Sequence, residues 1–134
     1  MNKINYIGGF FMNINTKLKN FPIETVIGLI RKKWAVPIIN DLFFGKTRFH
    51  EFKENRPQLS NKALSNCLKD LEKNGIINRI ADKYDKKNVK YYLTEKGKSL
   101  NKIIYEMAIF SVDSESYTDQ TKRELKSVFR EKLL

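Results

Sequence analysis

The sequence is poor in residues that bind metals or form disulfides. Its 134 residues include one cysteine, Cys67, and one histidine, His50. A single cysteine excludes an intrachain disulfide framework and a cysteine-based zinc site, and it favours a reducing compartment. His50 has no second histidine and no nearby cysteine to complete a metal site, so we interpret it as a surface or helix-packing residue. We expect no metal and no other cofactor.

Long apolar runs are also missing. The apolar stretch 6–12 is interrupted by Gly8 and Gly9, and it is far shorter than the roughly 18 residues that a membrane span needs. It also lacks the small-residue cleavage site of a secretory signal. We therefore expect a cytoplasmic protein without a targeting segment. One hypothesis is that residues 8–12 contain a translated ribosome-binding site and that the true start is Met12.

The sequence contains no recognisable catalytic pattern. It shows no Ser-His-Asp set, no glycine-rich phosphate loop and no pair of carboxylates at catalytic spacing. It shows no internal repeat and no low-complexity tract either. We interpret the chain as a protein that is not an enzyme.

Basic residues are abundant and unevenly distributed. The net charge is +11, and residues 46–90 hold 12 basic and 6 acidic side chains, whereas residues 91–134 hold 8 and 7. A basic centre suits a protein that docks one face on a polyanion, because Lys and Arg displace phosphate counterions. The alternative is a solvated basic surface. The length fits one domain, and 41% hydrophobic residues are enough to form a core.

Apolar spacing predicts three helices in the first half of the chain. Pro22 suits the first turn of a helix whose apolar residues continue to position 30. A second helix is expected at about 33–43, ended by Gly45. Phe49 and Phe52 share the face of a short helix, which ends before Pro57.

The strongest helix prediction begins after Ser60, which is a good N-cap. An apolar stripe follows and stops at Asn74-Gly75, a typical C-terminal signal. The opposite face is polar and begins at the cap itself. We predict that this face contacts DNA through Ser60, Asn61, Lys62, Ser65, Asn66 and Lys69. The alternative is an ordinary amphipathic surface helix with Cys67 as a packing residue.

Two β-rich segments, 76–80 and 89–93, flank a charged run and predict a β-hairpin. Its basic side chains suit a phosphate backbone or a minor groove. The predicted contacts are Arg79, Lys83, Lys86, Lys87 and Lys90. Further candidate phosphate contacts are Lys32, Lys33 and Arg48. The alternative for each basic cluster is a solvated surface.

Two helices are expected in the last third of the chain. Thr94 caps a long one, and Thr121 with Glu124 offers a capping box for the last, with a loop at 113–119 between them. Their apolar faces are candidates for a homodimer interface. The predicted interface residues are Ile23, Leu100, Ile103, Ile104, Met107, Leu125, Val128, Phe129 and Leu133.

This order of elements predicts a winged helix-turn-helix: a mainly α fold with a small β-hairpin wing. We divide the chain into an N-terminal extension (1–20), a DNA-binding domain (21–98) and C-terminal helices (99–134). An α-helix fits the major groove, where an Asn such as Asn66 can bond adenine bidentately. Lys62 and Lys69 suit guanine edges or phosphates, and Asn61 and Ser65 suit bases or phosphates.

The sequence also resembles the HxlR-type regulators, close relatives of the MarR-type winged helix proteins, over about residues 21–100. The resemblance rests on an ordered set of short segments. These are Phe21-Pro22-Ile23-Glu24, Lys33-Trp34, Pro37-Ile38-Ile39, Asp41-Leu42, Gly45, Arg48-Phe49-His50-Glu51-Phe52, Leu59-Ser60-Asn61-Lys62-Ala63-Leu64, Leu68-Lys69-Asp70-Leu71-Glu72, Gly75-Ile76-Ile77 and Tyr92-Leu93-Thr94-Glu95-Lys96-Gly97.

The resemblance implies a dimeric transcription factor. Its terminal helices would form the partner interface, and the helix capped by Ser60 would contact the major groove. Similar proteins usually carry a cysteine where this chain has Phe21, and in some of them it senses oxidants or electrophiles, so thiol sensing at that position is not expected here. Arg31-Lys32 replaces a common Gly-Gly, and Lys86-Lys87-Asn88 replaces a proline-rich wing tip that ends in arginine.

Two other functions stay open at this point. One is a winged helix used for protein docking or for nonspecific chromatin binding, since fold alone does not fix function. The other is a sensor gated by redox or by a small aromatic effector held between helices. The sequence does not choose between repression and activation, and repression is the commoner activity of similar proteins.

Overall fold

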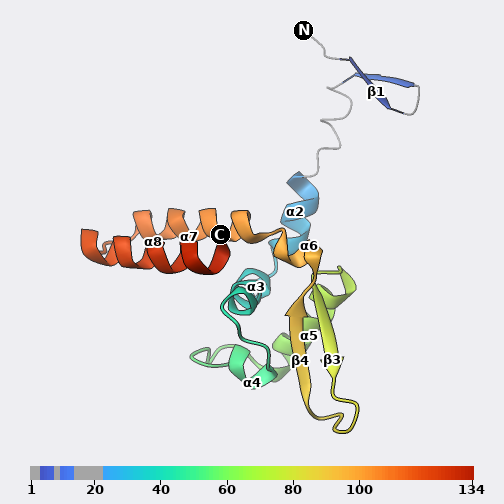
Figure 1. The fold of residues 1–134 in the computed structure, drawn as a ribbon, viewed down its shortest axis with the longest axis vertical. Coiled ribbons are helices and arrows are strands. Elements are labelled where there is room, and N and C mark those ends of the chain that lie inside the picture. Colours follow the sequence, from blue (N-terminus) through green and yellow to red (C-terminus); the bar gives the residue numbers. More distant parts are fainter. Residues whose placement is uncertain (1–3, 8–9, 14–22) are drawn as a thin grey trace. The chain divides into compact units, whose positions relative to one another are not determined.

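The computed structural model describes residues 4–7, 10–13 and 23–134, and the chain divides into two units, 1–31 and 32–134 (Figure 1). In the first unit, β1 (Ile4–Ile7) pairs antiparallel with β2 (Phe10–Asn13), and α2 (Ile23–Ile30) follows. The helix was predicted and the hairpin was not. The predicted helix start at Pro22 and the position of Phe21 lie outside the described residues.

The second unit has the expected order of elements. It contains α3 (Ala35–Phe43), α4 (Phe49–Phe52), α5 (Asn61–Lys73), β3 (Ile77–Ala81), β4 (Val89–Leu93), α6 (Glu95–Lys98), α7 (Asn101–Ser114) and α8 (Asp119–Leu133). Three helices precede a two-stranded hairpin, and three more follow it. This confirms the predicted fold, mainly α with a β-hairpin wing.

The core lies where α3, α4, α5 and the start of β3 meet. Each contributes apolar side chains at the spacing that puts them on one face. The fully buried large side chains are Ile38, Ile39, Phe52, Leu59, Leu64, Leu71, Ile76 and Ile77. Fully burying one such side chain contributes about 1.5–3 kcal/mol. Phe52 also packs edge-on against Tyr91, with ring centroids 6.1 Å apart, so the core includes the wing's second strand.

Helix α5 begins and ends as its sequence predicts. The Ser60 Oγ accepts a hydrogen bond from the backbone N–H of Ala63 at 3.0 Å. This satisfies one of the donors that the first helical turn leaves free. At the other end Gly75 adopts a φ of 73°, which glycine tolerates without a steric penalty. The inward stripe predicted for this helix is buried at Leu64, Cys67, Leu68 and Leu71.

The wing is a β-hairpin that is attached along β4 to the rest of the unit. Ile77 lies opposite Leu93, and Ala81 lies opposite Val89, so the first strand is shifted by one residue from the prediction. The backbone N–H of Tyr91 donates to the carbonyl of Thr47 at 2.8 Å. The chain between α3 and α4 thus pairs with the free edge of β4.

The long helix expected after Thr94 is two helices. Thr94 does act as a cap, accepting from the Gly97 N–H at 3.0 Å, but α6 ends at Lys98. The Leu100 N–H then bonds the Gly97 carbonyl, three residues back, which tightens the chain before α7 begins. Gly97 packs so closely on Ile76 that a Cβ there would overlap the Ile76 carbonyl oxygen. This docking onto the start of β3 separates α6 from α7.

The start of the last helix also differs from the prediction. Thr118 is the cap of α8 and accepts from the N–H of Thr121 at 3.2 Å, so Thr121 lies inside the first turn. Because α7 continues to Ser114, only residues 115–118 connect the two helices. Helices α7 and α8 lie side by side (Figure 1), joined by an ion pair of 2.6 Å between Lys126 and Asp113.

Candidate nucleic-acid interface

The outward face of α5 is free of the chain's own core. Ser65 is partly exposed, and every other residue predicted to contact DNA from this helix is exposed. The exposed set is Ser60, Asn61, Lys62, Asn66 and Lys69. Two of the exposed residues already have partners, since the Ser60 hydroxyl caps the helix and the Asn61 Oδ1 accepts from the Lys53 ammonium. The packing therefore presents a polar flank of α5 to solvent.

A groove joins this flank to the wing. A cavity of about 310 Å³ lies between α5 and the hairpin. Its lining includes Ser65 and Lys69 from the helix and Arg79 from β3. The structure thus brings together residues that the sequence assigned to two separate contact regions. Lys69 and Arg79 place two positive charges beside one groove, against the single negative charge of Glu72, and the excess of positive charge suits a phosphate that passes between helix and wing.

The wing extends away from the core and carries the predicted cations. Arg79, Lys83, Lys86 and Lys87 are exposed, and Lys90 is partly exposed. The connecting loop closes through Asp82, whose backbone N–H donates to the carbonyl of Asn88 at 2.9 Å. The hairpin therefore holds its positive charges on an ordered support.

The Asp82 carboxylate also organises the loop from within. Its Oδ1 accepts from the backbone N–H groups of Tyr84 and Asp85, at 2.8 and 3.2 Å. These bonds lower the pKa of Asp82, because they favour its charged form. Such an Asx turn replaces regular strand pairing at the end of the hairpin.

The three further candidate phosphate contacts all have interactions within the chain. The Lys32 Nζ lies 3.0 Å from a carboxylate oxygen of Asp70 on α5, although 52% of the Lys32 side chain stays exposed. The Lys33 ammonium lies 5.0 Å from the centroid of the Trp34 ring. Arg48 donates from Nη1 to the Asn88 Oδ1 at 2.7 Å. Arg48 therefore ties the base of the wing loop to the start of α4.

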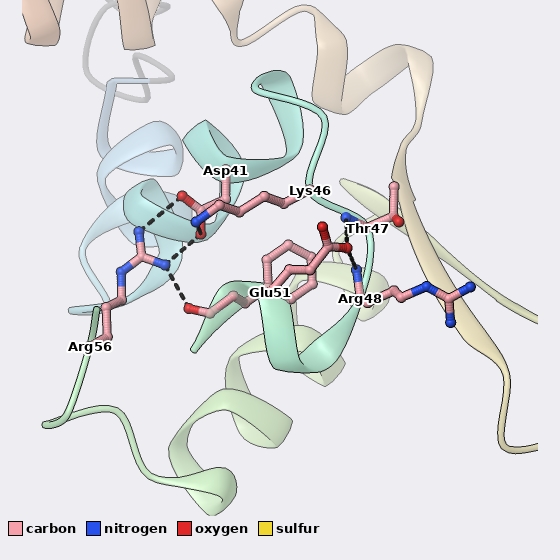
Figure 2. A network of polar contacts seen from close by, with 7 residues as sticks. Asp41, Lys46, Thr47, Arg48, Glu51 and Arg56 are labelled. Atoms are coloured by element: carbon pink, nitrogen blue, oxygen red, sulfur yellow. Dashed lines mark hydrogen bonds and ion pairs between the residues drawn. The ribbon is translucent and has the colours of Figure 1, made fainter. Parts of the chain in front are cut away.

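A buried ion-pair network, which no sequence pattern predicts, positions the turn before α5 (Figure 2). Asp41 on α3 is only 6% exposed. Its Oδ2 and Oδ1 accept from the Arg56 Nη1 and Nη2 at 2.5 and 3.0 Å. Arg56 also donates to the Phe52 carbonyl at 2.7 Å, and the Lys46 Nζ lies 3.8 Å from the Asp41 Oδ2.

This network connects the turn between α4 and α5 to helix α3. A bidentate Arg–carboxylate pair is directional as well as strong. The hydrogen bond to Asp41 raises the pKa of Arg56, so the guanidinium stays charged. The pair spans fifteen positions in sequence, and no local spacing indicates it. Asp41 belongs to one of the family segments, which by itself predicts no role for it.

Glu51 fixes the start of α4 in the same region (Figure 2). Its Oε1 accepts from the backbone N–H groups of Thr47 and Arg48, at 3.2 and 2.9 Å. The bond from Thr47 is the main cause of the lowered pKa of Glu51. Because Thr47 also bonds β4, this carboxylate helps to hold the segment on which the wing rests.

The predicted dimer interface needs correction. Leu100, Ile104 and Leu133 are at most 8% exposed, because they face the chain's own core, and they are not available to a partner. Phe129 packs edge-on against Phe44, with ring centroids 5.7 Å apart. Leu125 is partly exposed, and Ile23 lies at the start of α2.

The exposed apolar residues of α7 lie along one side. Ile103, Met107 and the unpredicted Phe110 are 37%, 41% and 74% exposed, and they line one shallow surface. Val128 on α8 is 43% exposed. These side chains, and not the buried ones, are free to meet another molecule.

Cys67 has the environment of a packing residue. It is 9% exposed, and burial raises the pKa of its thiol to about 11. A thiol with such a pKa contains little nucleophilic thiolate at neutral pH. Among the described residues, no three His, Cys, Asp or Glu side chains cluster as metal ligands. No helix in the same ranges is long and apolar enough to cross a membrane.

The sequence profile of the HxlR-like helix-turn-helix family matches residues 29–120. The chain belongs to this family. It is a DNA-binding transcriptional regulator, as are its relatives. The helix-turn-helix-type transcriptional regulator YdeP of Bacillus subtilis is 36% identical over 86 residues, which are 64% of this chain and 67% of YdeP.

Solved structures share the fold. The oxidised form of the redox regulator HypR has a TM-score of 0.65 and 29% identity, covering 72% of this chain and all of that one. The quinone-bound YodB of Bacillus subtilis has a TM-score of 0.57 and 37% identity, covering 66% of this chain and 92% of that one. The order of elements in the winged helix is therefore shared with regulators of this family.

Proposed function

We propose that this regulator is a homodimer that recognises a specific DNA sequence, with α5 in the major groove and the wing on the adjacent backbone or minor groove. The observation that carries the proposal is the polarity of α5. One face is buried at Leu64, Leu68 and Leu71, and the opposite face exposes hydrogen-bonding and basic side chains. A major groove accepts one α-helix with this arrangement.

Each exposed residue of α5 has a role that suits its chemistry. Asn66 offers a donor and an acceptor to adenine, and Lys62 suits a guanine edge or a phosphate. Lys69 lies beside Arg79 in the groove toward the wing, which favours a phosphate contact. Asn61 and Ser65 are assigned to bases or phosphates, and Ser60 to capping with a backbone contact.

The wing supplies positive charge that does not depend on sequence. We assign phosphate contacts to Lys83, Lys86 and Lys87 of the wing loop and to Lys90 of β4, because the hairpin that carries them extends from the core. Lys32 and Lys33 precede α3, and Lys32 lies beside Asp70 of α5, so we assign both lysines to phosphate contacts near that helix. Arg48 is assigned to holding the wing through Asn88, with a phosphate as its second partner.

A second copy of the chain is proposed to cover the exposed row on α7. Ile103, Met107 and Phe110 form an apolar surface bordered by Lys102 and Glu106, so two such surfaces can pair in opposite directions with charge complementarity. A two-fold dimer contacts half-sites about 34–36 Å apart on one side of the duplex. Repression, by blocking a promoter in the cytoplasm, is the activity we propose.

DNA selection tests this function. The full chain is incubated with a randomised 30-base-pair pool, and the enriched duplex is compared with random duplex of equal length. We expect a common sequence bound more than tenfold better than random DNA, since specific binding typically exceeds nonspecific binding by about 10³ or more. Equal binding would favour a nonspecific chromatin protein, and no DNA binding would favour a docking module.

The dimer has its own test. Phe110→Glu places a charge in the proposed interface, whereas Ser127→Glu places the same charge on an exposed position of α8 outside it. Sedimentation equilibrium should show a dimer for the wild type and for S127E, and a monomer for F110E. Unchanged mass for F110E would exclude this surface as the interface.

A further inference from the structure

Tyr84 at the end of the wing has no role in the function described so far. Its side chain is 90% exposed, the highest value among the exposed large hydrophobic residues that the structure describes. A single exposed apolar side chain needs no explanation by itself. This one, however, stands at the tip of the hairpin between Asp82 and Asp85, in a loop that also presents Lys83 and Lys86.

The ring is presented by a loop with internal hydrogen bonds. The Tyr84 backbone N–H donates to the Asp82 Oδ1 at 2.8 Å, and the Lys87 N–H donates to the Asp85 Oδ1 at 3.0 Å. The Asn88 N–H donates to the Asp85 carbonyl at 2.9 Å. These bonds restrict the backbone on both sides of the tip, so less conformational entropy is lost when the ring binds something.

Cations accompany the ring. The Lys83 ammonium lies 5.6 Å from the ring centroid, within the range of a cation–π contact. Lys86 and Lys87 on the same loop are exposed. A ligand surface that is complementary to this ring and its lysines therefore has negative charge around a flat, less polar centre. The minor groove of DNA has this character, with phosphates on both walls and deoxyribose and base edges between them.

We propose that Tyr84 is the residue of the wing that enters the minor groove, where its ring packs on deoxyribose and partly unstacks a base step. The flanking lysines bind the phosphates on either side. Pyrimidine–purine steps such as TA and CA unstack with the least cost, so Tyr84 adds a preference for such a step beside the sequence contacted by α5. The ring contributes affinity that does not depend on counterion release.

The inference rests on the proposed DNA contact of the wing, and the test separates the two. The probe is the duplex enriched by the full chain, and the variants are Tyr84→Ala, Tyr84→Phe and the charge control Lys86→Ala. Binding is measured by fluorescence anisotropy at four salt concentrations. A thermal melt of each variant checks the fold, which an exposed tip residue should leave unchanged.

Distinct results are expected for the ring and for the charge. Y84A should bind about tenfold more weakly at every salt concentration, by analogy with other aromatic–nucleotide contacts. Y84F should stay within about threefold of the wild type, because the ring is kept. K86A should reduce the salt slope by roughly one. Y84A binding within about twofold of the wild type, or a changed salt slope for Y84A, overturns the proposal.

A second measurement detects the proposed unstacking of the base step directly. Each adenine of the duplex is replaced in turn by 2-aminopurine, whose fluorescence rises when it unstacks. The wild type and Y84F should raise the fluorescence at one position outside the α5 half-site, and Y84A should not. The same rise in fluorescence with Y84A, or no rise with any variant, contradicts the proposed unstacking by Tyr84. If selection yields no common sequence, the proposed sequence-specific recognition is wrong. The affinities of the wild type and the Tyr84 variants are then compared on random duplex, and this comparison still decides the role of Tyr84.

Discussion

Helix α5 and the wing are both proposed to contact DNA, but they are held in different ways. The helix buries one face, with Leu64 and Leu71 fully enclosed, whereas every residue from 78 to 87 in the wing is exposed. The base of the wing packs through Ile77 and Tyr91, and its exposed part depends on hydrogen bonds from Arg48 to Asn88 and within the Asp82 turn. Packing thus fixes the helix proposed to recognise bases, and polar contacts order the loop proposed to contact the DNA backbone.

This difference predicts where mutations act. Changes around α5 that disturb packing or the buried network should reduce the stability of the whole unit. Changes on its exposed face or in the wing should alter DNA binding and leave the fold intact. The following predictions test this division, from the largest expected effect to the smallest.

Asp41→Ala should have the largest effect. It removes the acceptor of a bidentate pair and leaves the Arg56 guanidinium partly buried without a carboxylate. Breaking a buried pair in this way typically costs about 3–5 kcal/mol, and we expect the lower end because Arg56 is partly exposed. Urea unfolding measures the loss.

A matched control for Asp41→Ala is Asp70→Ala, which removes the surface ion pair with Lys32. Exposed pairs contribute about 0–1 kcal/mol, so D70A should unfold close to the wild type. Equal losses for the two variants would mean that the Asp41 network is not what holds the turn before α5.

Asn66→Ala should leave stability unchanged and weaken DNA binding. If Asn66 bonds a base, its loss costs about 1–3 kcal/mol at the selected sequence and relaxes the preference at one base pair. Anisotropy on the selected duplex and on its three single-base variants at that position measures both effects. Asn78→Ala changes an exposed asparagine on β3 and serves as the control, and an equal loss for N78A would argue against base contact by Asn66.

Lys87→Ala should produce a smaller loss that is the same for all sequences. A lost phosphate contact reduces the slope of log K against log salt by roughly one, without changing the order of preferred sequences. Lys132→Ala removes an exposed charge from α8, far along the chain from the wing, and should leave the slope unchanged. A loss of affinity for K87A that depends on the DNA sequence would indicate that Lys87 contacts bases and not phosphates.

The smallest effect concerns pH. Backbone hydrogen bonds from Tyr84 and Asp85 lower the pKa of Asp82 below its ordinary value of 3.8. The contribution of Asp82 to loop order is therefore fully present above pH 3.8, and it is lost as the pH falls through the lower folded-state pKa. A carboxyl NMR titration should give a midpoint below 3.8, with faster amide exchange at Tyr84 once Asp82 is protonated. A midpoint at or above 3.8 would show that the turn does not form.

Local signals predicted the elements that rest on local contacts. Ser60 and Asn74-Gly75 marked α5 because capping and a left-handed glycine act within a few residues. One boundary was missed for the opposite reason. The break after α6 depends on Gly97 meeting Ile76, twenty-one positions earlier, which no periodicity reveals.

The same limit applies to the site. Residue type and helical spacing were enough to place the polar flank of α5 and the cations of the wing. They were not enough to pair Asp41 with Arg56, or to show that Leu100, Ile104 and Leu133 belong to the chain's own core. Tyr84 was overlooked because an aromatic residue between charges resembles an ordinary loop residue until its exposure is known.

The contact between Gly97 and the Ile76 carbonyl leaves no room for a methyl group, so α6 lies directly against the residue before β3. Helix α6 also contacts the end of α5, because the Lys96 ammonium donates to the Asn74 carbonyl. Helix α7, which is proposed to contact a second subunit, follows α6 in the chain. The helix proposed to contact DNA and the helix proposed to contact a second subunit are therefore connected through α6. A residue larger than glycine at position 97 would push α6 away from Ile76, and in the proposed dimer this would shift the start of α7 relative to α5.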